Sequence, residues 1–137
     1  MIYVSRRERF CAAHRLFRSD WSDAKNEEVF GLCSNPQWHG HNYELFVTIS
    51  GEVNQETGFV INLKELSLLI KNKIILKIDH KNLNTEVDFL KNKIISTENV
   101  AIAIWQELEK PISELGSRLH CIKLVETENN YVEYFGN

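Results

Sequence analysis

The chain has 137 residues, of which 43% are hydrophobic and 26% are charged, a composition typical of a folded domain and not of a disordered or fibrous protein. The formal net charge of −3 leaves no basic surplus for nucleic acid, and no apolar stretch is long enough to cross a membrane. The three cysteines are far apart and form no C-x-x-C pair, which argues against a disulfide framework. We therefore expect one cytoplasmic domain over residues 1–137, with neither nucleic acid nor membrane as a partner.

The first predicted element is a strand over residues 2–13. Apolar side chains recur there at even positions, as in a strand with one face in the core, and His14 continues that face. Residues 16–35 are mostly polar and predict a long excursion with one helical turn before Val29 and Phe30. A loop of this length in a compact domain is often functional.

The middle of the chain predicts a strand followed by a helix. Apolar and polar residues alternate from Tyr43 to Ile49, in a strand that begins near His39. Residues 51–58 contain the run N-Q-E-T-G and indicate a turn. Apolar side chains then recur at helical spacing and predict a helix over residues 63–77, which ends at the polar run D-H-K-N-L-N.

The last third predicts a second helix and a hairpin. Ser96 or Thr97 can cap the free amides of the helix start, and Pro111 should bend or end the helix. Residues 119–135 predict two strands joined at residues 128–130. Together the elements give an α+β fold with a four-stranded antiparallel sheet and two helices. Its open sheet edges favour closure by oligomerisation.

His39, Gly40 and His41 carry the strongest local signal for chemistry. Residues two apart in a strand project to one face, so two imidazoles aim at one point and the glycine leaves room between them. His14 is the natural third ligand of a catalytic zinc that keeps one position open. Because H-x-H is common, the alternative is three unrelated histidines, and His120 is assigned to structure.

Two further groups could transfer protons. Cys33 precedes the histidine pair in a predicted turn, where a nearby zinc ion or protonated histidine would favour the thiolate and let it act as a base. Asp79 and His80 follow the first helix, and a carboxylate beside an imidazole can hold its tautomer. The alternatives are an inert thiol, which we favour for Cys11 and Cys121, and a polar pair that only ends a helix.

Glu126 stands where the strand pattern expects an apolar residue. It shares an even-numbered face with Ile122 and Leu124. Carboxylates are seldom buried without a partner. Glu126 must therefore reach solvent, pair with an internal Arg or Lys, or accept two hydrogen bonds from a bound ligand.

Five sequence blocks resemble the 6-pyruvoyl-tetrahydropterin synthase family in order and spacing, and together they cover nearly the whole chain. The blocks are F-C-A-A-H-R-L at 10–16, F-G-L-C-S-N-P-Q-W-H-G-H-N-Y at 30–43, D-H-K-N-L-N at 79–84, S-T-E-N-V-A at 96–101 and V-E-T at 125–127. The resemblance implies the tunnelling fold (T-fold). In this fold trimers close their sheets into a barrel, and two trimers stack as a homo-hexamer with active sites at the subunit interfaces.

The resemblance also implies roles for individual residues. The implied Zn²⁺ ligands are His14, His39 and His41. The implied proton-transfer group is Cys33, Asp79 and His80. The implied pterin anchor is Glu126, in a pocket lined by Ser96, Thr97 and Glu98. The implied enzyme is a carbon–oxygen lyase that converts 7,8-dihydroneopterin triphosphate to 6-pyruvoyl-tetrahydropterin and eliminates triphosphate.

Two other functions remain open. The related 6-carboxy-5,6,7,8-tetrahydropterin synthase of the queuosine pathway uses the same substrate and metal but releases acetaldehyde. Its cysteine commonly stands closer to H-G-H, whereas five residues separate Cys33 from His39 here. A non-catalytic zinc-containing oligomer that binds a pterin belongs to another class, and the presence of the whole proton-transfer group argues against it. The chain departs from the family pattern at Cys11, commonly Ser, and at residues 37–38, commonly smaller.

Overall fold

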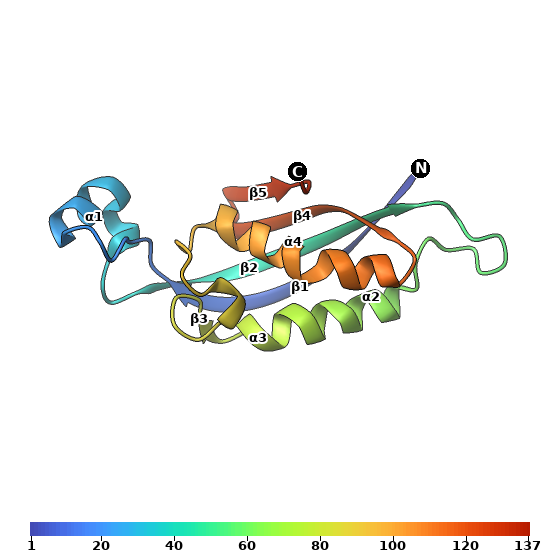
Figure 1. Ribbon diagram of the computed structural model, residues 1–137, viewed down its shortest axis with the longest axis horizontal. Helices are drawn as coiled ribbons and strands as arrows, with labels where there is room; N and C mark the ends of the chain where they lie inside the picture. The colour runs from blue at the N-terminus through green and yellow to red at the C-terminus, as the bar shows by residue number, and fades with distance from the viewer.

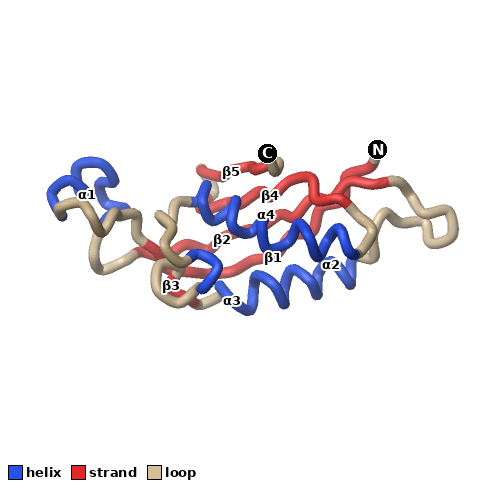
Figure 2. Tube along the Cα trace, viewed as in Figure 1, coloured by secondary structure: helices blue, strands red, loops and turns tan.

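Figure 1 shows the computed structural model, which describes all residues from 1 to 137. One five-stranded sheet has the strand order β3-β1-β2-β4-β5. Its strands are β1 (Ile2–His14), β2 (His39–Gly51), β3 (Lys81–Asn82), β4 (Arg118–Thr127) and β5 (Asn130–Tyr134). The longer helices lie together on one face of the sheet, and this layering confirms the predicted α+β class (Figure 2).

The sheet has five strands, so the predicted number of four is wrong. The additional strand, β3, is two residues long and pairs in parallel with β1 beside Ala12 and Ala13, so the sheet is not wholly antiparallel. A strand this short has no periodic pattern to detect in the sequence. It matters because it fixes the preceding loop to the sheet edge, where the amide of His80 donates to the carbonyl of Cys11 at 2.7 Å.

β1 and β2 form a long antiparallel ladder in which each strand has 13 residues. Its register runs from Ile2 opposite Gly51 to His14 opposite His39. The alternation predicted for β2 is confirmed, because the side chains at odd positions from Tyr43 to Ile49 are at most 1% exposed. The register therefore decides which residues meet at the end of the ladder.

The helical elements are α1 (Asp23–Phe30), α2 (Leu63–Ile70), α3 (Leu76–Ile78) and α4 (Thr97–Glu114). α1 has eight residues where a single turn was predicted, and it lies beyond the sheet at one end of the molecule (Figure 1). Its only buried residue is Asn26, whose side chain bonds to the backbone of Arg18. A helix without an apolar stripe gives no periodic signal, which explains the underestimate.

Residues 63–78 form one nearly continuous helical rod, as predicted, but its middle part, Lys71–Ile75, is π-helical. The core-facing side chains of the rod recur at every fourth residue and are Leu66, Ile70, Ile74 and Ile78. On a regular helix of about 3.6 residues per turn, such a stripe would drift by about 40° at each step. The wider π turn reverses part of this drift. All four side chains are therefore at 0% exposure.

α4 begins where the sequence predicts. Ser96 is its N-cap, and its hydroxyl accepts the amide of Asn99 at 3.2 Å. A bend or an end was predicted at Pro111; the helix continues to Glu114, so the end is wrong. Proline removes one backbone hydrogen bond near the terminus, and the full burial of Ile112 stabilises the final turn.

The hydrophobic core consists of 25 buried residues from the sheet, the helices that cover it and the segments that connect them. The opposite face of the sheet carries no helix (Figure 2), and the odd-numbered side chains of β1 on that face are exposed or half-buried. None of the helices is both long and apolar enough to span a bilayer. The core places rigid strands beneath the site described next.

Candidate functional site

Three histidines meet at the end of the β1–β2 ladder. His14 and His39 are direct partners across the strands, and His41 lies two residues further along β2 on the same face. The ring centroids are 4.5 Å apart for His14 and His39, 5.1 Å for His14 and His41, and 5.0 Å for His39 and His41. One nitrogen of each ring lies within 4.8 Å of the others. The fold thus brings together the three residues that the sequence singled out as metal ligands.

The histidine cluster contains buried nitrogens that no protein group satisfies. Nδ1–H of His14 donates to the carbonyl of Ile95 at 2.9 Å, which leaves a lone pair on Nε2. Nε2 of His14, Nδ1 of His39 and Nε2 of His41 are buried without a hydrogen-bond partner. Unsatisfied polar atoms are rare in protein interiors and call for an explanation. A metal ion bound to the three nitrogens would provide it.

Burial favours the neutral form of two of the three histidines. Burial lowers the pKa of His14, because desolvation penalises the imidazolium form, and repulsion from His39 and His41 acts in the same direction. The pKa of His39 is lowered by burial and by His41. Neutral imidazoles are the form that ligates transition metals, so the lowered pKa values of His14 and His39 favour metal binding.

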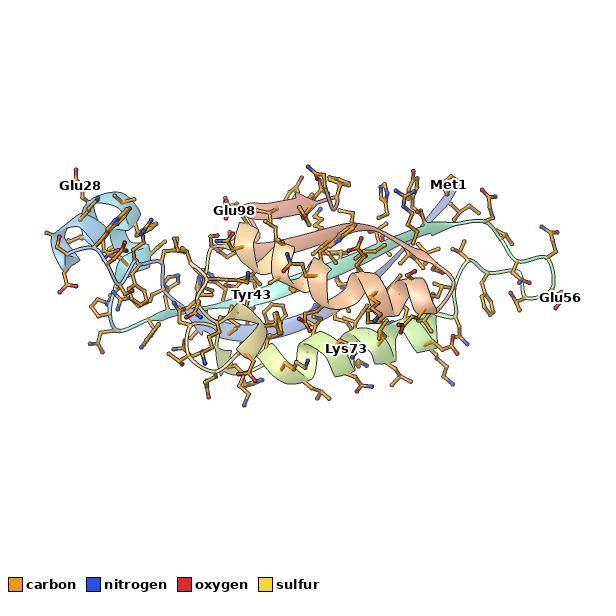
Figure 3. All side chains as sticks on the ribbon, viewed as in Figure 1. Met1, Glu28, Tyr43, Glu56, Lys73 and Glu98 are labelled. Carbon is orange, nitrogen blue, oxygen red and sulfur yellow. The ribbon has the colours of Figure 1, made fainter.

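Tyr43, labelled in Figure 3, was not singled out from the sequence as a site residue, yet it lies next to the histidines. Its ring centroid is 5.5 Å from that of His41 and 6.1 Å from that of His14. Phe10 stacks on its other side at 4.8 Å. The Tyr43 hydroxyl is buried without a partner, and burial raises its pKa far above the ordinary value. Tyr43 therefore acts as a rigid, uncharged support for the cluster.

Glu126 of β4 approaches the same cluster. Its Oε1 lies 3.7 Å from Nε2 of His41, and its Oε2 accepts a short hydrogen bond from the hydroxyl of Thr97. No Arg or Lys pairs with it, so that alternative is wrong. The side chain is 21% exposed, and Glu98 lies exposed in the first turn of α4 after the capping Ser96 (Figure 3). The carboxylate thus stands between the histidines and the start of α4.

Asp79 and His80 form a pair at the sheet edge. Oδ1 of Asp79 lies 3.0 Å from Nδ1 of His80 and also accepts the amide of Cys11 at 3.0 Å. Burial alone would raise the pKa of Asp79, but hydrogen bonds from Cys11 and His80 hold it below its ordinary value. His80 has a φ of 60°, which is uncommon for a residue other than glycine, and its side chain is 79% exposed. Such backbone conformations concentrate at functional sites.

The thiol beside this pair belongs to Cys11. One ligand atom each from Cys11, Asp79 and His80 lie within 4.8 Å of one another. Cys33 is exposed in the 3₁₀ turn Gly31–Ser34, which follows α1, and it belongs to no such group. Within one chain, the predicted proton-transfer group is therefore incomplete. The signal for Cys11 was its odd position in β1, which directs its side chain away from the core.

With this geometry established, similarity to known proteins identifies the family. The sequence profile of the family described as 6-pyruvoyl tetrahydropterin synthase matches residues 3–137. The 6-pyruvoyl tetrahydrobiopterin synthase of Pongo abelii is 45% identical over 133 residues, which cover 97% of this chain and 90% of the relative. The chain belongs to the 6-pyruvoyl tetrahydropterin synthase family.

The same family name describes a solved structure of similar shape. The Caenorhabditis elegans 6-pyruvoyl tetrahydropterin synthase matches with a TM-score of 0.92 at 36% identity, and the match covers 99% of this chain and 96% of that one. A 6-carboxy-5,6,7,8-tetrahydropterin synthase of Bacillus subtilis is 29% identical over 112 residues, covering 78% of this chain and 73% of the relative. Membership of the 6-pyruvoyl tetrahydropterin synthase family confirms the predicted resemblance and the lyase class.

Proposed function

We propose that the chain converts 7,8-dihydroneopterin triphosphate to 6-pyruvoyl-tetrahydropterin and eliminates triphosphate. The observation that carries this proposal is the group of three unpartnered imidazole nitrogens beside the carboxylate of Glu126. A metal-binding group next to a carboxylate suits a substrate whose ring is anchored at one point and whose side chain reacts at another. The 45% identity to a 6-pyruvoyl tetrahydrobiopterin synthase favours the same reaction.

We assign Zn²⁺ to His14, His39 and His41. Three neutral nitrogen ligands with one position left for water or substrate are the donor set of catalytic zinc. When bound, zinc supplies Lewis acidity that polarises the hydroxyl groups of the substrate side chain. The carbonyl of Ile95 holds the ring of His14 in one orientation, as partners of metal-bound histidines commonly do.

Glu126 and the start of α4 bind the pterin ring in this proposal. The carboxylate accepts two hydrogen bonds, from the amino group and the adjacent ring N–H of the pterin. The hydroxyl of Thr97 donates to Oε2 and thereby orients the carboxylate. Ser96 and Glu98 flank Thr97 at the helix start and line the ring pocket.

Asp79, His80 and Cys33 move protons. Asp79 accepts the Nδ1–H of His80, so the neutral imidazole keeps its Nε2 lone pair for a substrate proton. Cys33 acts as the second proton-transfer group. Because Cys33 lies apart from this pair within the chain, we infer that its exposed thiol meets Asp79 and His80 of a neighbouring subunit.

A shared site requires an oligomer, and we propose a homo-hexamer in the cytoplasm. Trimers would close the sheets into a barrel, and two trimers would stack. The short β3 and β5 form the two edges of the sheet, and one of its faces lacks a helix. Unpaired edges and an uncovered face are surfaces that oligomerisation protects.

The test is to incubate the zinc-loaded protein with 7,8-dihydroneopterin triphosphate, follow triphosphate and acetaldehyde, and identify the pterin by mass. We expect triphosphate, a pyruvoyl pterin and no acetaldehyde. Acetaldehyde with a carboxy pterin would instead identify a 6-carboxy-5,6,7,8-tetrahydropterin synthase. Binding of the substrate without turnover would identify a pterin-binding oligomer that does no chemistry.

A further inference from the structure

A second group of metal-ligating side chains lies outside the histidine cluster. It consists of Cys11, Asp79 and His80, whose ligand atoms all lie within 4.8 Å of one another. Cys11 comes from β1 and is 68 residues away from Asp79 in the sequence, so the fold brings the three donors together. They offer one sulfur, one oxygen and one nitrogen, each of which is a recognised ligand of zinc.

We propose that Cys11, Asp79 and His80 bind a second Zn²⁺ ion. Three protein ligands with a water as the fourth make a complete tetrahedral zinc site. Ligands held by one zinc ion at about 2.0–2.3 Å lie within about 4 Å of each other. The ligand atoms lie within 4.8 Å of one another before any ion is bound, and the His80 side chain is 79% exposed and therefore free to adjust.

The backbone already holds the three donors close to a binding geometry. The amide of Cys11 donates to Oδ1 of Asp79 at 3.0 Å, and the carbonyl of Cys11 accepts the amide of His80 at 2.7 Å. These bonds leave Oδ2 of Asp79 for a metal. Part of the entropy cost of ordering the ligands is therefore met by the fold before a metal ion binds.

Solvent and metal can reach the group. The side chains of Asp79 and His80 are 35% and 79% exposed, and Cys11 is half-buried. A hollow of about 550 Å³ is lined by Cys11, His80 and also His41 of the histidine cluster. Binding would release the proton of the Cys11 thiol to solvent, because only the thiolate ligates zinc. A serine at this position would offer no comparable ligand.

The second ion would be inhibitory, a consequence that rests on the proposed function. A zinc ion bound to Asp79 and His80 occupies the lone pairs that proton transfer requires. We expect zinc in excess of one equivalent to slow turnover. The Cys11→Ser variant should need a zinc concentration about tenfold or more higher for the same inhibition, as a ligand is lost.

Metal binding is tested on the full-length, metal-free protein titrated with Zn²⁺ and with Co²⁺. We expect two equivalents of metal per chain and the near-ultraviolet charge-transfer absorption of a cobalt–thiolate bond. Cys11→Ser should bind one equivalent and lack the absorption, and His80→Asn should also bind one. Cys121→Ser is the matched control, because it removes the buried thiol of β4, which belongs to neither group of ligands, and it should keep both signals.

A wild-type chain that binds one equivalent without the thiolate absorption would overturn the second site. So would a Cys11→Ser protein that retains the absorption, or a Cys121→Ser protein that loses it. These readouts do not depend on turnover. If the protein proves inactive towards the pterin but binds two ions with the absorption, the second site stands and the proposed function fails.

Discussion

The two clusters of potential metal ligands differ in how the fold builds them. The histidine cluster is closed: His14 is 1% exposed, and its Nδ1–H is held by a backbone carbonyl from the segment before α4. The cluster of Cys11, Asp79 and His80 is open, with His80 mostly exposed. The first depends on the register of two long strands, and the second on a contact between β1 and a two-residue edge strand.

Because of this difference in burial, we expect the histidine cluster to retain its metal and the exposed cluster to exchange its ligands. A largely buried cluster holds its ligands in a fixed geometry, which suits a resident metal ion. An exposed cluster at a sheet edge can exchange ligands with solvent or accept a group from another subunit. The experiments below test whether the two clusters behave as differently as their burial indicates.

The largest effect is expected from His39→Ala. Removing one of three nitrogen ligands should weaken metal binding by more than about 100-fold, beyond what is typical when only a partner of a ligand is lost. Turnover should disappear with the metal. The metal-to-protein ratio after dialysis measures the first effect. His120→Ala is the control, because His120 packs between Tyr3 and Phe135 and belongs to neither cluster.

Loss of Cys33 or His80 should lower kcat by about 10²–10⁴-fold, the range of general acid–base catalysis. If the proton-transfer group spans two subunits, Cys33→Ala and His80→Ala chains should complement each other after unfolding and refolding together. Random mixing restores up to about one quarter of the sites. Activity measured before and after mixing decides the point, and mixtures that remain inactive would place the whole group within one subunit.

Glu126→Gln should lower kcat/KM by about 10- to 100-fold, since a hydrogen bond to a charged group contributes about 1.5–3 kcal/mol. Thr97→Val removes only the bond that orients the carboxylate and should have a smaller effect. Both variants should retain the metal. Steady-state kinetics measure the effect on binding of the pterin ring, and metal content measures the effect on metal binding. Loss of metal in either variant would show that these residues also support the metal site.

In the metal-free protein, burial of His14 and His39 should make the free energy of unfolding depend on pH. Burial lowers the pKa of His14 and His39 below their ordinary value of 6.5. Below that pH the unfolded chain binds more protons than the folded chain, so the free energy of unfolding should fall as the pH drops from 6.5 towards the folded pKa values. Urea midpoints across this range measure the fall. The His14→Asn, His39→Asn double variant should show a shallower decline.

The smallest effect is expected from Ser96→Ala. Loss of the N-cap of α4 should lower the free energy of unfolding by about 1 kcal/mol. It should also raise KM, because Thr97 follows directly. Asn62→Ala is the matched control, since Asn62 caps α2 through the amide of Lys64 and lies away from the clusters. We expect both variants to lose about the same stability, and only Ser96→Ala to change KM.

The sequence predicted the histidine cluster well because strand alternation carries the information. The even face of β1 ends at His14, and H-x-H aims two rings to one side of β2. Once the two strands pair antiparallel, His14 and the H-x-H pair lie at the same end of the ladder. The start of α4 was likewise predictable, because Ser96 is a strong capping signal.

The remainder depended on contacts that no local pattern encodes. Cys11 was read as inert because its strand position was clear, whereas its neighbour, Asp79, lies 68 residues further along the chain. β3 was missed because it is so short, and the length of α1 was underestimated because the helix has no apolar stripe. The end predicted at Pro111 failed because tertiary packing outweighed a local rule.

The π-helical segment Lys71–Ile75 gives the chain a tolerance for the loss of one residue. Its last residue, Ile75, accepts the amide of Asp79 at 2.9 Å, so the helix leads directly to the carboxylate. A π turn contains about one residue more than an α turn, so a chain that lacks one residue of this segment could form a regular α-helix instead. Ile78 would still face the core, and Asp79 would remain beside Cys11.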